Sequence, residues 1–344
     1  MTVRLGINGF GRIGRSVERA ILARGQTDVE LVAVNDPFGD AATMAFLLKH
    51  DSVGGTLPNE IKVTDRGFSV DGHEITKLEA RDPADIPWGD HGVDVVIEST
   101  GLFTDREQAA GHLAAGARKV VISAPSGNAD VTICLGVNDD AYDPDAHTVI
   151  SNASCTTNCL APLAKVLHDT FGVEGGFITT VHAYTSDQQL QDQAHVSRKG
   201  KADLRRMRAA ALSIIPSSTG AARAIGQVLP ALQGRLDGMA MRVPTPTGSI
   251  TDLVATLQRP ATVDEVNAAF LAAAADPSYR GVLEYSDEPL VSADIVGNPA
   301  SCIFSAVDTM ARDRTVKVLG WYDNEWGYAN RLVDVVAFVA TAGS

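Results

Sequence analysis

A glycine-rich turn near the start of the chain constrains the fold more than any other feature of the sequence. Residues 3–8 form an apolar run that predicts a strand, and residues 9–14 read Gly-Phe-Gly-Arg-Ile-Gly directly after it. Apolar residues then recur at helical spacing over 13–23, so the turn lies between a strand and a helix. In that setting glycines let the backbone approach a pyrophosphate at the helix N-terminus. These glycines are Gly9, Gly11 and Gly14.

An acidic residue follows the next predicted strand. Residues 30–34 form that strand, which ends in Asn35 and Asp36, 22 residues after Gly14. A carboxylate at this place accepts hydrogen bonds from the adenosine ribose hydroxyls and repels a 2′-phosphate. A Rossmann-like fold without a cofactor is the alternative, but strand, turn, helix, strand and acid together favour a dinucleotide site. Asp36 favours NAD over NADP.

Further strands and polar strand ends extend this first domain. Residues 41–88 form an insertion with one helix and short strands, and the α/β alternation returns with the apolar strand 93–98. Thr100 and Ser123 come at the ends of predicted strands, where an α/β sheet presents its ligand crevice. We therefore expect a parallel-sheet NAD-binding domain over residues 1–152.

The next candidate is a cysteine between a strand and a helix. A β-branched run at 148–150 precedes it, and apolar residues recur at helical spacing over 160–171, so Cys155 lies near a helix start. Free N–H groups there favour negative charge, which predicts a lowered thiol pKa and a nucleophilic thiolate. A buried structural cysteine is the alternative.

The second half of the chain supplies a base for that thiol. A long β-type run over 177–185 carries His182 near its end, although a lone histidine on a strand is more often structural. A polar stretch over 186–208 predicts a long loop. Thiol, imidazole and NAD together indicate aldehyde oxidation through a thiohemiacetal and a thioester.

Hydroxyl and arginine side chains suggest two anion sites. Thr185 and Arg235 could serve one anion. A second could be held at the starts of two helices, although helix capping explains each hydroxyl equally well. The residues of this second set are Ser154, Thr156, Thr219 and Gly220.

Composition excludes several classes of partner. The chain has 29 basic and 42 acidic residues, a formal charge of −13, which argues against binding to nucleic acid or to anionic membranes. No apolar run reaches the length of a membrane span, and no secretory signal is evident, so we expect a cytoplasmic enzyme with free thiols. Cys155 and Cys159 have no second ligand pair at zinc spacing, so no metal is expected.

A series of motifs along the whole chain resembles phosphorylating glyceraldehyde-3-phosphate dehydrogenases. They are Ile7-Asn8-Gly9-Phe10-Gly11-Arg12-Ile13-Gly14, Asn35-Asp36-Pro37-Phe38, Glu98-Ser99-Thr100-Gly101, Ser123-Ala124-Pro125-Ser126, Ser154-Cys155-Thr156-Thr157-Asn158, His182-Ala183-Tyr184-Thr185, Ser218-Thr219-Gly220-Ala221-Ala222, Arg242-Val243-Pro244-Thr245-Pro246 and Trp321-Tyr322-Asp323-Asn324-Glu325-Trp326-Gly327-Tyr328.

The resemblance implies a fold, a reaction and a set of site residues. The fold is a Rossmann NAD-binding domain over 1–152, with the 325–344 helix packing back on it, and an α+β catalytic domain over 153–324 with a mainly antiparallel sheet and a long loop at about 184–208. Cys155 attacks D-glyceraldehyde 3-phosphate, His182 acts as acid and base, NAD takes the hydride, and inorganic phosphate releases 1,3-bisphosphoglycerate, in glycolysis or gluconeogenesis. Four subunits associate. NAD contacts fall to Arg12, Ile13, Asp36, Arg81, Ser123 and Asn324. The substrate phosphate is expected to bind to Thr185 and Arg235. The attacking phosphate is expected to bind to Ser154, Thr156, Arg205, Thr219 and Gly220.

The polar loop departs from the family pattern. Residues 192–195 lack the proline of the family's turn, and 196–202 add several residues before the basic run that contains Arg205. We hypothesise that the altered loop changes the access of electrophilic inhibitors to Cys155, as in a specialised isoform.

Two alternatives remain at this point. An erythrose-4-phosphate dehydrogenase would share the Cys and His but would need no inorganic phosphate. A catalytically silent regulatory protein on the same fold would be expected to lose Cys155, His182 or Asp36, and all three are present.

Overall fold

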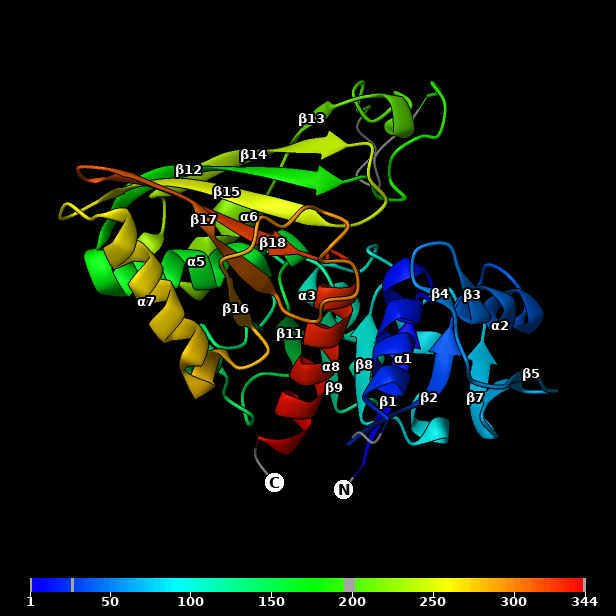
Figure 1. Cartoon of the computed structure of the whole chain (residues 1–344). Coiled ribbons are helices and arrows are strands. Elements are labelled where there is room, and N and C mark those ends of the chain that lie inside the picture. Colours follow the sequence, from blue (N-terminus) through cyan, green and yellow to red (C-terminus); the bar gives the residue numbers. More distant parts are fainter. Residues whose placement is uncertain (1, 26–27, 195–201, 343–344) are drawn as a thin grey trace. The chain divides into compact units, whose positions relative to one another are not determined.

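The chain forms two compact units, shown in the computed structural model of Figure 1. The structure describes residues 2–25, 28–194 and 202–342. The first unit comprises residues 1–133, 140–153 and 329–344, and the second comprises 134–139 and 154–328. None of the helices in these described ranges is long and apolar enough to cross a membrane.

A twisted sheet of nine strands, sheet A, forms the centre of the first unit. Its order is β10-β11-β9-β8-β1-β2-β7-β6-β5, parallel from β10 to β7 and antiparallel only at the β7-β6-β5 end. The strand order reverses at β1, the arrangement that places a ligand crevice at the carboxyl ends of β1 and its neighbours. The expected Rossmann fold is confirmed.

The elements of this unit are β1 Val3–Asn8, α1 Arg12–Arg24, β2 Val29–Asn35, α2 Ala41–Lys49, β3 His50–Asp51, β4 Gly55–Thr56, β5 Ile61–Val63, β6 Gly67–Val70, β7 His73–Leu78, β8 Val95–Glu98, α3 Arg106–Ala109, α4 Gly111–Ala114, β9 Lys119–Ile122, β10 Val131–Thr132 and β11 Val149–Ser151. The closing helix α8, Trp326–Thr341, belongs to this unit from Ala329 onward. Arg24 of α1 bonds to Asn330 and Asp334 of α8 and ties the two helices together.

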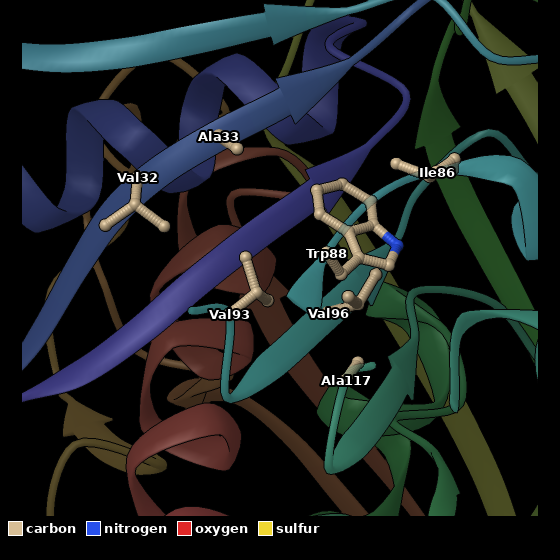
Figure 2. Close-up of a cluster of buried hydrophobic side chains, with 7 residues drawn as sticks. All are labelled: Val32, Ala33, Ile86, Trp88, Val93, Val96 and Ala117. Carbon is tan, nitrogen blue, oxygen red and sulfur yellow. The ribbon is translucent and has the colours of Figure 1, made fainter. Parts of the chain in front are cut away.

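An indole side chain organises the core beneath the sheet. Trp88 is fully buried and packs among the apolar residues labelled in Figure 2. Gly6 of β1 leaves room for the ring, because a Cβ there would lie 2.8 Å from the indole. The other members of this cluster are Val32, Ala33, Ile86, Val93, Val96 and Ala117.

A second sheet of seven strands, sheet C, forms the other unit. Its order is β13-β14-β12-β15-β18-β17-β16, with antiparallel pairs apart from β12/β14 and β16/β17. The expected mainly antiparallel sheet is therefore confirmed. Its elements are α5 Cys155–Phe171, β12 Val173–Ala183, β13 Ile215–Ser218, α6 Ala221–Val228, β14 Leu236–Val243, β15 Ser249–Leu257, α7 Val263–Ala275, β16 Leu283–Ser286, β17 Cys302–Arg312 and β18 Thr315–Tyr322.

Helices α5, α6 and α7 cover one face of this sheet (Figure 1). The opposite face carries a row of cross-strand partners, Phe177, Val254, Lys317 and Met310. Phe177 is 72% exposed and Met310 is 61% exposed. A sheet that is covered on one side alone explains why its strands alternate between buried and exposed residues.

A buried carboxylate on α1 makes the stability of the first unit depend on pH. Glu18 is 3% exposed, its Oε2 has no hydrogen-bond partner among the described residues, and burial raises its pKa to about 8. The unfolded chain releases this proton near pH 4.5 and the folded chain only near pH 8. Stability therefore falls as pH rises between these values, by about 5 kcal/mol in total.

Glu18→Gln removes this ionisation. We expect its thermal unfolding midpoint to match that of the wild type at pH 5 and to exceed it by several degrees at pH 9, measured by scanning calorimetry. The matched control is Glu79→Gln, since Glu79 is 72% exposed in its side chain and should show no such difference. Equal midpoints for Glu18→Gln and wild type at pH 9 would contradict the prediction.

Candidate functional site

The glycine turn of the first unit has the geometry that a dinucleotide requires. Gly9 has a φ of +92°, and a Cβ there would meet the Thr100 backbone N at 2.7 Å. A Cβ on Gly14 would lie 2.4 Å from the Gly9 oxygen, so this glycine allows the helix to approach the strand. Gly11 has open space around it and is the N-cap of α1, with no side chain capping the helix. The free N–H groups at this helix start therefore fit a pyrophosphate.

The residue expected at the ribose is fixed by the backbone. Asp36 follows β2, and its two carboxylate oxygens accept from the Phe10 N at 3.0 Å and the Phe38 N at 2.9 Å. Each oxygen keeps a further lone pair for a ribose hydroxyl. Arg81 stands over the exposed Phe38 ring at 5.7 Å and so lies beside the same strand end.

The remaining predicted cofactor residues of this unit lie around the same turn. Arg12, at the first position of α1, forms an ion pair with Asp51, and the neighbouring Ile13 is half-buried. Thr100 donates to the Glu98 carboxylate, and Ser123 Oγ donates to the Glu98 backbone oxygen at 3.0 Å. These two residues follow β8 and β9 at the carboxyl edge of sheet A.

In the second unit, Cys155 is the first residue of helix α5. Ser154 caps the helix by accepting from the Thr157 N at 3.1 Å, and Ala153 before it has a φ of +52°. A left-handed conformation at an alanine costs about 1–2 kcal/mol. Among the four cysteines, all within the described residues, Cys155 is partly exposed and the other three are buried.

An imidazole faces this thiol. His182 Nε2 lies 3.5 Å from Cys155 Sγ, and Nδ1 lies 2.7 Å from the Ala183 oxygen. Nδ1 faces two opposed partners, the Ala183 oxygen, which can only accept, and Arg242 Nη1 at 2.8 Å, which can only donate, so these contacts alone do not set the tautomer. In the tautomer that carries its proton on Nδ1, the Nε2 lone pair is directed at the thiol, as a general base requires.

An arginine that sequence reasoning did not assign stands beside the pair. Arg242 on β14 is the register partner of His182 on β12. Its Nη1 lies 2.8 Å from His182 Nδ1 and donates to the Ala183 oxygen at 3.1 Å and to Thr185 Oγ1 at 3.2 Å. Within the described part of the chain, no carboxylate forms an ion pair with Arg242. A largely buried guanidinium without a counter-ion favours an anionic ligand.

The ionisation of the pair differs from the expected thiolate. Burial raises the pKa of the Cys155 thiol to about 11, although the Arg242 charge acts to lower it. Burial, with Arg242 adding to it, lowers the pKa of His182 to about 3. The prediction of a thiolate at neutral pH is therefore wrong for this state of the protein, because the loss of solvent outweighs the nearby charge. The pair is neutral, and the proton must move when the thiol reacts.

Two of the predicted arginines lie elsewhere. Arg235 precedes β14 at the end opposite Arg242, and its Nη1 donates to the Val173 oxygen at 2.8 Å. Along a strand, seven residues span about 23 Å, so Arg235 cannot share an anion with Thr185. The arginine that bonds to Thr185 is Arg242.

In the basic run, the arginine near the thiol–imidazole pair lies one residue after the predicted one. Arg205 donates to the Pro216 oxygen at 3.2 Å and is exposed. Arg206 forms an ion pair with Asp187, which also accepts from Thr185 Oγ1, and its charge lowers the pKa of His182. Arg206, not Arg205, thus faces the thiol–imidazole pair. Arg205 and Arg206 are neighbours whose side chains point in different directions, and the sequence alone does not tell which of them points toward the pair.

The hydroxyls expected to hold the attacking phosphate already make bonds within the protein. Ser154 caps α5, and Thr219 Oγ1 accepts from the Ala221 N at 3.2 Å. Thr156 is 5% exposed, and its Oγ1 lies 2.8 Å from the buried Tyr322 hydroxyl. Gly220, at the N-cap of α6, is exposed and contributes only its backbone. A role for these four residues in binding phosphate stays a prediction.

Asn324 belongs to the second unit. Its Oδ1 accepts from Ser249 Oγ at 2.8 Å, and Ser249 Oγ in turn accepts from the Ala183 N at 3.0 Å. One serine therefore links Asn324 to the strand of His182. The contact of Asn324 with NAD stays a prediction.

Most of the segment that the loop adds, 196–202, lies outside the described residues, which exclude 195–201. The hypothesis about inhibitor access is therefore untested. Within the described ranges, no group of three or more His, Cys, Asp and Glu side chains is placed to hold a metal.

The parallel sheet with its glycine turn and the thiol–imidazole pair define a class, the NAD-dependent dehydrogenases with a cysteine nucleophile. Family models agree: residues 3–106 match the glyceraldehyde 3-phosphate dehydrogenase NAD binding domain, and residues 154–324 match the C-terminal domain. The chain is 59% identical over 339 residues to glyceraldehyde-3-phosphate dehydrogenase 1 of Streptomyces avermitilis, covering 98% of this chain and 99% of the relative. It is 57% identical to the Geobacillus stearothermophilus glyceraldehyde-3-phosphate dehydrogenase over the full length of both. The chain belongs to the glyceraldehyde-3-phosphate dehydrogenase family.

Proposed function

We propose that this protein catalyses the NAD-dependent oxidative phosphorylation of D-glyceraldehyde 3-phosphate to 1,3-bisphosphoglycerate, with Cys155 as nucleophile and His182 as acid and base. The observation that carries the residue assignment is the 3.5 Å approach of His182 Nε2 to Cys155 Sγ, at the start of a helix and beside an unpaired Arg242. Family membership and relatives of this name support the activity.

The proton movements follow from the neutral pair. As Sγ bonds to the aldehyde carbon, its proton passes to His182 Nε2, and the Arg242 charge stabilises the sulfur while it gains negative character. The backbone N–H of Cys155, at the first position of α5, is free to donate to the former aldehyde oxygen. NAD, when bound, supplies the hydride acceptor. His182 returns the thiol proton to the former aldehyde oxygen, which forms the hemithioacetal hydroxyl, and takes it back as base when the hydride leaves the carbon. Inorganic phosphate then cleaves the resulting thioester, and the departing Cys155 sulfur recovers its proton from His182.

The Arg242 guanidinium, together with Thr185, is our candidate for binding the substrate phosphate. We expect Arg242→Leu to lower kcat/KM for glyceraldehyde 3-phosphate by about 100-fold, because a charge-assisted bond to the anion is lost. Steady-state kinetics at saturating NAD measure this change. Arg235→Leu is the matched control, at the other end of β14, and should stay within about three-fold of wild type. A larger loss in Arg235→Leu than in Arg242→Leu would contradict the assignment.

The reaction is tested by the appearance of NADH with glyceraldehyde 3-phosphate, with and without inorganic phosphate. We expect sustained turnover only when phosphate is present, since phosphate is the group that releases the thioester. Sustained turnover without it would favour an erythrose-4-phosphate type of dehydrogenase, in which water takes that role. No NADH under either condition would overturn the proposed activity.

Three further assignments belong to the same proposal. Residues 1–152 with 325–344 bind NAD, and 153–324 carry the catalytic residues. The chain acts in the cytoplasm, either in glycolysis or in gluconeogenesis. It assembles as a homotetramer, for which the exposed Phe177, Val254 and Met310 of sheet C offer an apolar face. Sedimentation at micromolar concentration tests the assembly.

A further inference from the structure

A row of buried polar side chains crosses sheet A beneath the candidate NAD site. Asn35, Asn8 and Glu98 are the last residues of β2, β1 and β8, and they are register partners across these strands. All three are at most 2% exposed. Asn35 Nδ2 donates to Asn8 Oδ1 at 2.8 Å, and Asn8 Nδ2 donates to Glu98 Oε2 at 2.6 Å. The row lies where the strand order reverses, at the carboxyl edge that forms the crevice.

Glu98 accepts four hydrogen bonds and donates none. Its Oε2 accepts from Asn8 and from His112 Nε2 at 3.0 Å, and its Oε1 accepts from the Thr100 N at 2.8 Å and from Thr100 Oγ1. Four donors use all the lone pairs of an ionised carboxylate. A glutamine in this place would present an amide N–H₂ to two of those donors in either orientation.

The position of the His112 proton is fixed from the far side. Trp88 Nε1 donates to His112 Nδ1 at 2.9 Å, and an indole N–H can only donate. The His112 proton therefore lies on Nε2, where it is donated to Glu98. The Trp88 ring itself is held by the apolar cluster of Figure 2, so the donor set is anchored in the core.

The other end of the network holds the turns of the crevice. Glu98 fixes both the backbone and the hydroxyl of Thr100. Ser99, between them, donates to the Gly9 oxygen at 2.6 Å and so joins this loop to the glycine turn. Ser123 follows β9, and its N and Oγ both bond to the Glu98 backbone oxygen at 3.0 Å. The Glu98 side chain, its backbone oxygen and the neighbouring Ser99 therefore join three crevice-forming loops.

We propose that Glu98, held by four donors that include His112, is a positioning residue for NAD: it fixes the Thr100 loop and the glycine turn in the binding conformation without touching the cofactor. The proposal rests on NAD binding to sheet A. The positioning role is measured by NAD affinity and not by turnover. The two proposals can therefore fail independently of each other.

The test is calorimetric titration of the full-length protein with NAD. We expect Glu98→Gln to raise the NAD Kd about 30-fold, since two charge-assisted bonds are replaced by opposed donors. The kcat at saturating NAD and the KM for glyceraldehyde 3-phosphate should change less than about three-fold. Glu107→Gln, an exposed carboxylate on α3, is the control and should leave the NAD Kd unchanged. A folded Glu98→Gln protein with a Kd within two-fold of wild type overturns the proposal.

Two more variants separate positioning from general destabilisation. Thr100→Val removes one donor to Glu98. If Thr100 acts through Glu98, the double variant Glu98→Gln/Thr100→Val should bind NAD no more weakly than Glu98→Gln alone. Additive losses overturn the proposal. Should Glu98→Gln fail to fold, Trp88→Phe takes its place, because it keeps the packed ring and removes only the N–H that fixes His112. We expect a Kd about three-fold higher with kcat unchanged, and a wild-type Kd in Trp88→Phe overturns the role of His112.

Discussion

Cys155→Ser is expected to lower turnover with glyceraldehyde 3-phosphate by about 10⁴-fold. Serine keeps the hydrogen-bonding capacity of the side chain but is a far weaker nucleophile at neutral pH, and its ester is a poorer acyl donor than a thioester. The change should leave NAD affinity intact, since the glycine turn, Asp36 and the Glu98 network all belong to the other unit. Initial rates of NADH formation and calorimetric NAD titration measure the two effects separately.

Cys159→Ser is the matched control for this substitution. Cys159 lies on the same helix, is buried, and its Sγ donates to the Gly320 oxygen at 3.4 Å, a bond that a hydroxyl can also make. We expect its turnover to stay within about three-fold of wild type. If Cys155→Ser retained a tenth of the wild-type rate, a requirement for the Cys155 sulfur would be excluded.

The fold could be predicted in large part because hydrophobic periodicity is local. The alternation of strand and helix around the glycine turn predicts the parallel sheet, and the helical spacing over 13–23 agrees within one residue with α1, Arg12–Arg24. Strand β17 was missed, although it has 11 residues. It carries Ser305, Asp308 and Thr309 among its apolar residues, and a β-bulge interrupts its register, so no period of two is visible.

The beginning of α6 shows another limit of local patterns. Thr219 and Gly220 lie at a helix start as expected, since α6 begins at Ala221, but the residues before them, Ile215–Ser218, form strand β13, which the sequence pattern does not predict. β13 exists because it pairs with β14, and that pairing is a long-range contact. Serine and proline at an edge strand resemble capping residues when the partner strand is not known.

The thiol and imidazole could be found from the sequence, but their anionic partner could not. Arg242 and Arg235 both flank or lie on β14, and only the parallel register with β12 decides that Arg242 stands beside His182. The burial of Cys155 could not be predicted from the sequence either. A helix start lowers a thiol pKa, yet the surroundings of Cys155 remove enough solvent to reverse the direction.

The neutral state of the pair predicts a characteristic pH dependence of thiol reactivity. The pKa of His182 is lowered to about 3 and that of Cys155 is raised to about 11, so between these values the thiol is protonated and the imidazole is neutral. The thiolate fraction then rises tenfold per pH unit. We expect iodoacetamide alkylation of Cys155 to become about 1,000-fold faster from pH 6 to pH 9. A preformed thiolate–imidazolium pair would instead give nearly equal rates at these two values.

His182→Asn separates the base from the nucleophile. We expect it to reduce turnover about 10³-fold, because His182 is the imidazole that lies against the thiol and Asn cannot accept a proton at neutral pH. The rise of alkylation rate with pH should persist in this variant, since it comes from the thiol and not from the imidazole. The three remaining cysteines are buried, so mass spectrometry of the peptide that contains residue 155 reports the relevant site. The neutral pair would be contradicted if the wild-type alkylation rate did not change between pH 6 and pH 9 and His182→Asn lost this pH-independent rate. In that case the free enzyme would hold a thiolate and an imidazolium, with His182 as a cation.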